Sequence, residues 1–135
     1  MRSLGRIALT ALAVGAVTIA SVLTLLYLAV QGEGRRMQEM TRGDFDLLVP
    51  ALARFEEDCG RYPSSSEGLD ALSKGPSGVA SSWRGPYLDK EIANDPWGHP
   101  YLYQPNTEGG FTLTCLGADN LTGGHGQDED VVVHG

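Results

Sequence analysis

The 135-residue sequence predicts an α+β protein with an apolar N-terminal helix, a second helical stretch behind it and a small antiparallel sheet. Three observations support this fold class. Residues 7–31 contain no charged side chain. Apolar residues then recur at three- and four-residue steps, which is typical of one helical face. Between residues 111 and 116 apolar residues alternate with threonines instead, the period-two pattern of a strand.

The uncharged stretch is long enough to cross a membrane. A bilayer core about 30 Å thick needs about 20 apolar residues in helical form, and residues 7–31 exceed that length. Basic residues at 2 and 6 precede the stretch, and the residues that follow it carry both signs of charge: Glu33, Arg35 and Arg36. This charge bias weakly favours a cytoplasmic N-terminus.

A cleaved secretory signal is the alternative interpretation of this stretch. Such signals have an apolar region of about 7–15 residues and a small-x-small cleavage site, and residues 28–31 match that pattern poorly. We therefore expect a short cytoplasmic tail over residues 1–6, a retained transmembrane helix over 7–31 and an extracytoplasmic domain over 32–135.

A second helical stretch follows the anchor and should end near Asp58. Gly60 stands where a C-cap glycine would, and Pro63 leads the chain away. Because proline lacks a backbone donor and clashes with the preceding turn, we expect a kink or a restart at Gly43 and Pro50. The apolar face comprises Met37, Met40, Leu47, Leu48, Ala51, Leu52 and Phe55.

Shorter elements fill the rest of the domain. Residues 64–67 (Ser-Ser-Ser-Glu) before Leu69 and Leu72 indicate a short capped helix. Residues 100–104 and 111–116 read as two strands, and the glycines between them make an antiparallel hairpin. Residues 131–133 are long enough only for a closing strand or a tail.

The charge distribution excludes one class of function. Net charge is −7, and no Lys or Arg follows Lys90, whereas seven acidic residues do. Such a surface repels phosphate, so we expect no nucleic-acid binding. No Ser/His/Asp arrangement and no activated nucleophile is visible, so we expect neither an enzyme nor a small-molecule substrate.

An acidic, glycine-rich segment over residues 116–130 is a candidate metal site. Its four glycines allow tight turns that can aim carbonyls inward, and Asp119, Asp128 and Asp130 supply carboxylate oxygens. Calcium accepts six to eight oxygen ligands of both kinds in flexible geometry. The spacing does not match an EF-hand. From composition alone, a solvated acidic loop remains the alternative.

Five motifs, in order, resemble the major pseudopilin of type II secretion systems. The resemblance spans residues from about 55 to 131, and the segment from Phe55 to Cys59 leads directly into the first motif. The motifs are Gly60-Arg61-Tyr62-Pro63, Glu67-Gly68-Leu69-Asp70-Ala71-Leu72, Trp83-Arg84-Gly85-Pro86-Tyr87-Leu88, Asp95-Pro96-Trp97-Gly98-His99-Pro100-Tyr101 and Leu116-Gly117-Ala118-Asp119. The resemblance implies a pilin-like domain, in which a long helix packs on a small antiparallel sheet that ends in a calcium loop.

The same resemblance implies a site, partners and a location. Asp119 and Asp130 match the family's calcium-binding carboxylates, Asp128 matches less firmly, and Leu116 is a candidate backbone-carbonyl ligand for Ca²⁺. The expected partners are copies of the chain and other secretion-apparatus subunits. The expected location is the bacterial inner membrane, with a single span and the domain in the periplasm.

The N-terminus departs from the family pattern. A prepilin leader ends in glycine, followed by phenylalanine and, four residues further on, a glutamate within the apolar stretch. Here Arg6 follows Gly5, and Thr10 stands at the glutamate position. An alternative function is therefore a stand-alone, membrane-anchored calcium-binding module that does not assemble. Thr10 and the helix-breaking Pro50 favour this alternative, whereas the intact domain motifs favour a secretion subunit.

The two cysteines, Cys59 and Cys115, lie outside any metal-binding spacing. In the fold of the family that this sequence resembles, the end of the first helix and the last strand should pack together. An oxidising compartment would then permit a disulfide. We expect a Cys59–Cys115 bridge, with two free buried thiols as the alternative.

Processing provides the first test. Because the Gly-Phe-x-x-x-Glu junction is missing, we expect the mature protein to retain residues 1–6, as measured by intact-mass analysis. A mass corresponding to a chain that starts at Arg6 with a methylated amine would contradict this expectation. It would also remove the main support for the stand-alone alternative.

Overall fold

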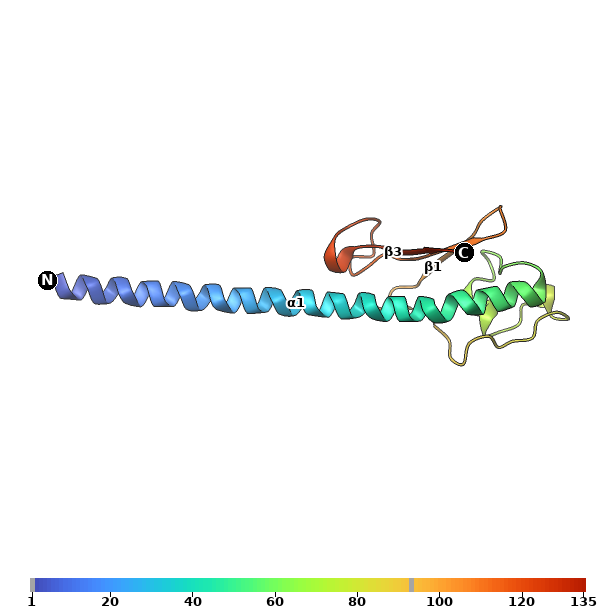
Figure 1. Cartoon of the computed structure of the whole chain (residues 1–135), viewed down its shortest axis with the longest axis horizontal. Helices are drawn as coiled ribbons and strands as arrows, with labels where there is room; N and C mark the ends of the chain where they lie inside the picture. The colour runs from blue at the N-terminus through green and yellow to red at the C-terminus, as the bar shows by residue number, and fades with distance from the viewer. Residues whose placement is uncertain (1, 93) are drawn as a thin grey trace. The chain divides into compact units, whose positions relative to one another are not determined.

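The computed structural model describes the backbone of residues 2–92 and 94–135, and side chains from residue 12 onward except those of 13 and 93. Three strands and three short 3₁₀ helices follow one long helix in sequence (Figure 1). In chain order the elements are α1 (Arg2–Cys59), η1 (Leu69–Leu72), η2 (Ser77–Val79), β1 (Leu102–Pro105), β2 (Phe111–Cys115), η3 (Gly126–Asp128) and β3 (Val131–His134). The chain divides into two compact units, one ending at Glu33 and the other comprising Gly34–Gly135.

The first unit is a helical segment suited to lipid. Within Val14–Cys59, an 18-residue window reaches a mean hydropathy of 1.9, and none of that window is buried in the protein. The Ser and Thr hydroxyl groups of residues 14–33 are costly in a bilayer unless they are paired, and each of the three donates to a backbone carbonyl of the same helix. These bonds join Thr18 to Gly15 (2.8 Å), Ser21 to Val17 (2.9 Å) and Thr24 to Ala20 (2.9 Å). The segment therefore has the length that a membrane span requires, and these three hydroxyl groups are satisfied within it.

The predicted boundaries at residues 6 and 31 stay predictions. The side chains of Arg6 and Thr10, on which the processing expectation depends, lie outside the described residues.

The predicted restart of the helix at Gly43 or Pro50 is wrong. α1 continues through both residues to Cys59. Proline in a helix interior costs about 3 kcal/mol because it removes a hydrogen bond and crowds the previous turn. Here Pro50 is exposed, while Leu48 and Leu52 on either side of it are fully buried. Packing of those two leucines outweighs the local penalty.

The end of α1 agrees with the sequence. Gly60 has a φ of +73°, and its N–H donates to the carbonyl of Glu56 (2.7 Å), which is the expected glycine cap. The helix ends at Cys59, one residue beyond the predicted Asp58.

A three-stranded antiparallel sheet, in the order β1-β2-β3, packs on the helix of the second unit. The predicted hairpin is confirmed, with β1 beginning two residues later than expected, and residues 131–134 form a true closing strand. The β1–β2 turn is held by the Asn106 side chain, which accepts from the N–H groups of Glu108 (3.0 Å) and Gly110 (2.7 Å). Gly109 provides the positive φ that the turn needs.

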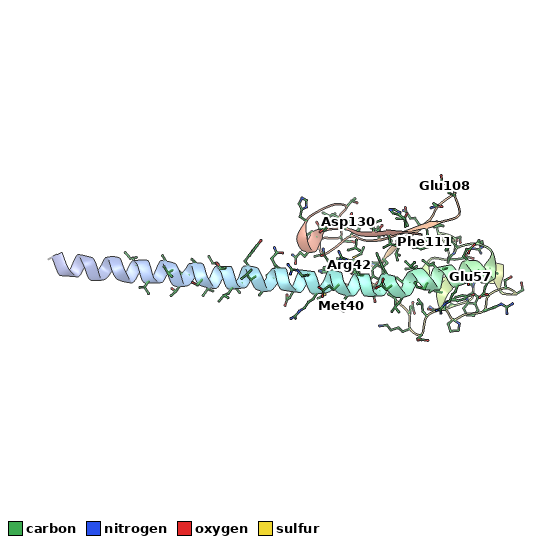
Figure 2. The ribbon with its side chains drawn as sticks, in the orientation of Figure 1. Met40, Arg42, Glu57, Glu108, Phe111 and Asp130 are labelled. Carbon is green, nitrogen blue, oxygen red and sulfur yellow. The ribbon has the colours of Figure 1, made fainter. Side chains whose placement is uncertain are left out.

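The core lies between α1 and β2. Alternate β2 residues are buried, so one face of the sheet meets the buried stripe of α1. Figure 2 shows Phe111 between the sheet and the helix. The buried apolar residues are Phe45, Leu48, Ala51, Leu52 and Phe55 of α1, Ala71 and Leu72 of η1, Ile92, Tyr101, and Phe111, Leu113 and Cys115 of β2.

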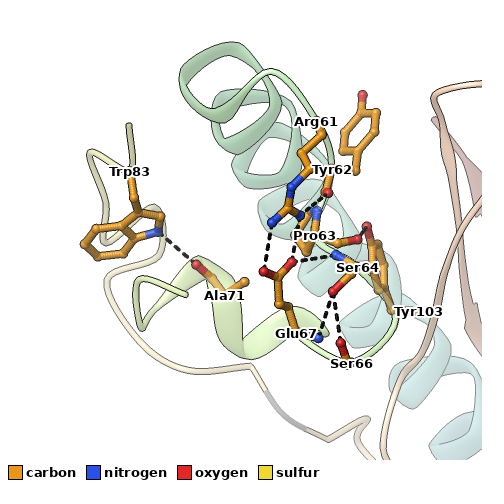
Figure 3. Close-up of polar contacts among 9 residues, drawn as sticks. All are labelled: Arg61, Tyr62, Pro63, Ser64, Ser66, Glu67, Ala71, Trp83 and Tyr103. Atoms are coloured by element: carbon orange, nitrogen blue, oxygen red, sulfur yellow. Dashed lines mark hydrogen bonds and ion pairs between the residues drawn. The ribbon is translucent and has the colours of Figure 1, made fainter. Parts of the chain in front are cut away.

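A polar latch closes the segment between α1 and η1 (Figure 3). Arg61 donates to both carboxylate oxygens of Glu67, at 2.7 and 2.8 Å. Glu67 also accepts from the Ser64 N–H (2.7 Å), and its own N–H donates to the Ser64 hydroxyl (3.3 Å). These are the predicted capping-box bonds, but they close a turn that ends at Gly68. The 3₁₀ helix η1 begins after Gly68, which gives it no side-chain cap.

The latch makes one contribution to the domain's stability depend on pH, through the carboxylate of Glu67. The Arg61 guanidinium beside it, together with the Ser64 bonds, lowers the pKa of Glu67 from 4.5 to about 2. A carboxyl group with a lowered folded-state pKa stabilises the domain above its unfolded pKa. That contribution is lost as the pH falls from about 4.5 towards about 2.

We expect Glu67→Gln to destabilise the domain by about 1–2 kcal/mol at pH 7, allowing for screening at the partly exposed Arg61. The amide oxygen still accepts from Ser64, so the change isolates the charge. The difference from wild type should shrink towards pH 2. Thermal unfolding of the full chain in detergent micelles measures it, with Glu91→Gln as the control because Glu91 makes only an exposed 3.9 Å contact with Lys74. Equal effects of the two variants would contradict the latch.

Candidate metal centre

The predicted calcium loop connects β2 to β3 and turns back on itself. Four glycines, Gly117, Gly123, Gly124 and Gly126, adopt positive φ, and so does Asn120. Near its C-terminal end the chain forms η3, closed by bonds from the Asp128 N–H to the His125 carbonyl (3.3 Å) and from the Glu129 N–H to the Gly126 carbonyl (3.4 Å). Left-handed backbone on this scale is available only where glycines dominate.

The two ends of the loop lie against each other. The Ala118 N–H donates to the Gln127 carbonyl (2.9 Å). A Cβ placed on Gly117 would lie 2.7 Å from the backbone carbon of Asp128, so only glycine allows this approach. The segment after Leu116 and the segment before Asp130 are therefore brought together, as a shared metal site would require.

Asp130 is the residue that best fits a bound cation. One carboxylate oxygen, Oδ2, accepts from the Gly123 N–H (3.0 Å). The other, Oδ1, is buried and has no hydrogen-bond partner among the residues that the structure describes. A buried carboxylate oxygen left without a partner is costly, and a metal ion would satisfy it. Figure 2 places Asp130 at the end of the sheet that lies nearer Arg42 than Glu57.

The other predicted ligands are placed less tightly. Asp119 is exposed, and its Oδ1 accepts from the Leu121 N–H (3.0 Å) in a local turn. Asp128 is half-buried within η3, and Leu116 is half-buried directly after β2. Within the described part of the chain, no three His, Cys, Asp or Glu side chains converge in a way that could hold a metal. A cation here would depend on Asp130 together with backbone carbonyls and water, which calcium tolerates.

A second polar centre, which sequence reasoning missed, lies beneath the end of β2. Asp95 is 5% exposed. Its Oδ1 accepts from the N–H groups of Trp97 (3.0 Å) and His99 (2.8 Å), and its Oδ2 accepts from the Cys115 thiol (3.2 Å). The signal in the sequence was the Asp-Pro-Trp-Gly run, because an aspartate often accepts from backbone N–H groups in the turn that follows it.

The expected Cys59–Cys115 disulfide is wrong, and both cysteines are free. The Cys115 sulfur lies 3.8 Å from the Thr41 hydroxyl. Cys59 follows Thr41 by 18 residues on the same helix, which corresponds to about 27 Å, whereas a disulfide requires Cα atoms within about 7 Å. The start of β2 lies near the end of α1 instead, since the rings of Tyr62 and Phe111 are 5.0 Å apart. Burial raises the pKa of the Cys115 thiol.

Comparisons with known proteins agree on one family. A family model described as type II secretion system (T2SS), protein G, matches residues 29–134. The type II secretion system core protein G of Pseudomonas aeruginosa is 39% identical over 95 residues, which cover 68% of this chain and 67% of that protein. The core protein G of Xanthomonas campestris pv. campestris is 36% identical over 117 residues, covering 85% and 79%.

A solved structure has the same fold. The crystal structure of the major pseudopilin from the type 2 secretion system of enterohaemorrhagic Escherichia coli aligns with a TM-score of 0.59 at 21% identity. The alignment covers 75% of this chain and 89% of that one.

Proposed function

Because the chain belongs to the protein G family of type II secretion systems, we propose that it is a calcium-stabilised pseudopilin-like subunit of such a system. The family match over residues 29–134 carries this proposal. The chain's role is structural and not enzymatic. Its N-terminal apolar helix anchors it in the inner membrane, and the domain from Gly34 onward lies in the periplasm.

The proposed partners are copies of the chain and other subunits of the secretion apparatus. One side of α1 within the domain supports this assignment. Met40 and Leu47 are seven residues apart and therefore lie on the same side of the helix. They are 58% and 52% exposed, although both are large and apolar. A structural subunit in an assembly needs such an uncovered helical face.

A stand-alone, membrane-anchored calcium-binding module is the second candidate function. Thr10 favours it, because this chain has no acidic residue within its apolar stretch. Carboxylates inside membranes are costly and are usually kept for a function. The function in question here is filament assembly. A chain without such a carboxylate in its apolar stretch would therefore lack the part of the helix that serves assembly.

Cross-linking in intact cells separates these two functions. We expect a lysine- and carboxylate-reactive cross-linker to give a ladder of dimers, trimers and larger species that contain the full chain. The ladder should weaken when Leu47→Glu places a charge on the exposed apolar side of α1. A folded, membrane-inserted chain that gives only monomer would contradict the secretion-subunit proposal and favour the stand-alone module.

Calcium binding rests on the loop after β2. The oxygens that would hold the ion are the carboxylates of Asp119, Asp128 and Asp130 and the backbone carbonyl of Leu116. When bound, the ion would neutralise like charges that otherwise repel one another. The buried, unpartnered Oδ1 of Asp130 supports this site. The absence of any Lys or Arg after Lys90 leaves those carboxylates without a permanently charged basic residue nearby in the sequence.

We expect calcium to raise the melting temperature of the full chain in detergent micelles. An ion that binds only the folded state adds about 2.7 kcal/mol of stability at a hundredfold excess over its Kd. Magnesium should substitute poorly, because it demands tighter octahedral geometry and gives up water reluctantly. Asp130→Asn should abolish most of the gain, since the amide can still accept from Gly123 but carries no charge. Asp119→Ala should also reduce it.

Glu129→Gln is the matched control for these variants, because it removes the same charge from the adjacent, exposed position. It should leave the calcium-dependent gain intact. The calcium proposal fails if the wild-type melting temperature in chelator does not change on addition of millimolar calcium.

A further inference from the structure

We propose that Gly34 and Gln38 of α1 are positioning residues for the calcium loop: they form a docking notch that holds the turn at Gly126 and Gln127. This inference rests on the proposed calcium site and adds to it the part of the helix that orients it. Gly34 and Gln38 are four residues apart in α1, so they lie about one helical turn apart on the same side of the helix.

Gly34 supplies the space in the notch. It is buried, and a Cβ built on it would lie 2.6 Å from the Gln127 Cβ and 3.3 Å from the Gln127 Cα. Neither atom is the end of a flexible side chain, so a side chain at position 34 would displace the turn itself. Glycine is otherwise unfavourable inside a helix, and this contact gives it a reason to be there.

Gln38 supplies the directional contact. Its side-chain Nε2 donates to the carbonyl of Gly126, a residue 88 positions away in sequence. Gly126 has a φ of +66°, a conformation in which glycine is unstrained, and its carbonyl also closes η3 through the Glu129 N–H. The hydrogen bond therefore fixes the first residue of η3 on the helix.

The turn is held on its other side by the start of the loop. The Gln127 carbonyl accepts from the Ala118 N–H (2.9 Å), and Gly117 packs against the backbone of Asp128. The turn is thus enclosed between α1 and the residues that follow Leu116. Asp128 belongs to the turn, and Asp130 comes two residues after it.

The positions of these two carboxylates therefore depend on α1. Ordering a glycine-rich loop is entropically unfavourable, and a loop that is already held in its bound conformation binds its ligand more tightly. With the notch intact, the loop is ordered before the ion arrives. Without it, ion binding must also order the loop, and the affinity falls.

Three variants test the notch in the full chain in detergent micelles. Gly34→Ala fills the space, and Gln38→Glu replaces the donor with a carboxylate of the same shape. Gly43→Ala is the matched control, because it makes the same change in the same helix where nothing lies within 4 Å of the new Cβ. Amide hydrogen exchange in chelator reports on the loop alone, and calcium titration calorimetry reports on the affinity.

We expect Gly34→Ala and Gln38→Glu to speed the exchange of the Ala118 and Asp128 amides by about tenfold or more in chelator and to weaken calcium affinity by a similar factor. Exchange in β1 and β2 should not change. Gly43→Ala should leave both measurements as in wild type.

The outcomes separate this inference from the calcium proposal. If Gly34→Ala and Gln38→Glu bind calcium as wild type does and their loop amides exchange at the wild-type rate, the notch is overturned and the calcium site stands. If wild type binds no calcium but the two variants still loosen the loop in chelator, the notch holds the loop and the calcium proposal is the one that fails.

Discussion

Burial of one stripe of α1 against β2 is the interaction on which the rest of the domain depends. Leu48, Leu52 and Phe55 of the helix and Phe111 and Leu113 of the strand are almost completely removed from water. Each large apolar side chain buried in this way contributes about 1.5–3 kcal/mol. Most of the remaining elements are too short to be stable alone, so they hold their conformations because they pack on this interface.

This interface explains why two predictions from the sequence are wrong: the restart of the helix and the Cys59–Cys115 disulfide. It keeps α1 continuous through Pro50, since the buried leucines on either side cannot stay packed if the helix breaks. It also sets the direction of β2, whose first residue lies near the end of α1 and whose last lies near Thr41. That direction separates the two cysteines and places the loop after β2 beside the helix residues that follow the apolar stretch.

The same geometry gives the domain two polar centres with different purposes. At the end of β2, Asp95 is buried but accepts from two backbone N–H groups and a thiol, so its charge is satisfied within the protein. In the loop that follows, Asp130 is satisfied at only one oxygen. Among the described residues, Asp130 Oδ1 and His99 Nδ1 are the buried side-chain atoms without a partner, and only the carboxylate oxygen could accept a cation, which is the physical basis for proposing one in the loop.

Local patterns in the sequence were enough to determine the apolar N-terminal helix, the helix end at Gly60, the capping of residues 64–67, the hairpin and the glycine-rich loop, because each depends on neighbouring residues alone. The ordered motifs were enough to identify the family. Only the tertiary structure decided that Pro50 does not break the helix, that Cys59 and Cys115 stay apart, and that Gly34 and Gln38 touch a loop about ninety residues away. These outcomes depend on which faces pack and in which direction a strand runs along the helix, and neither is written in any local spacing.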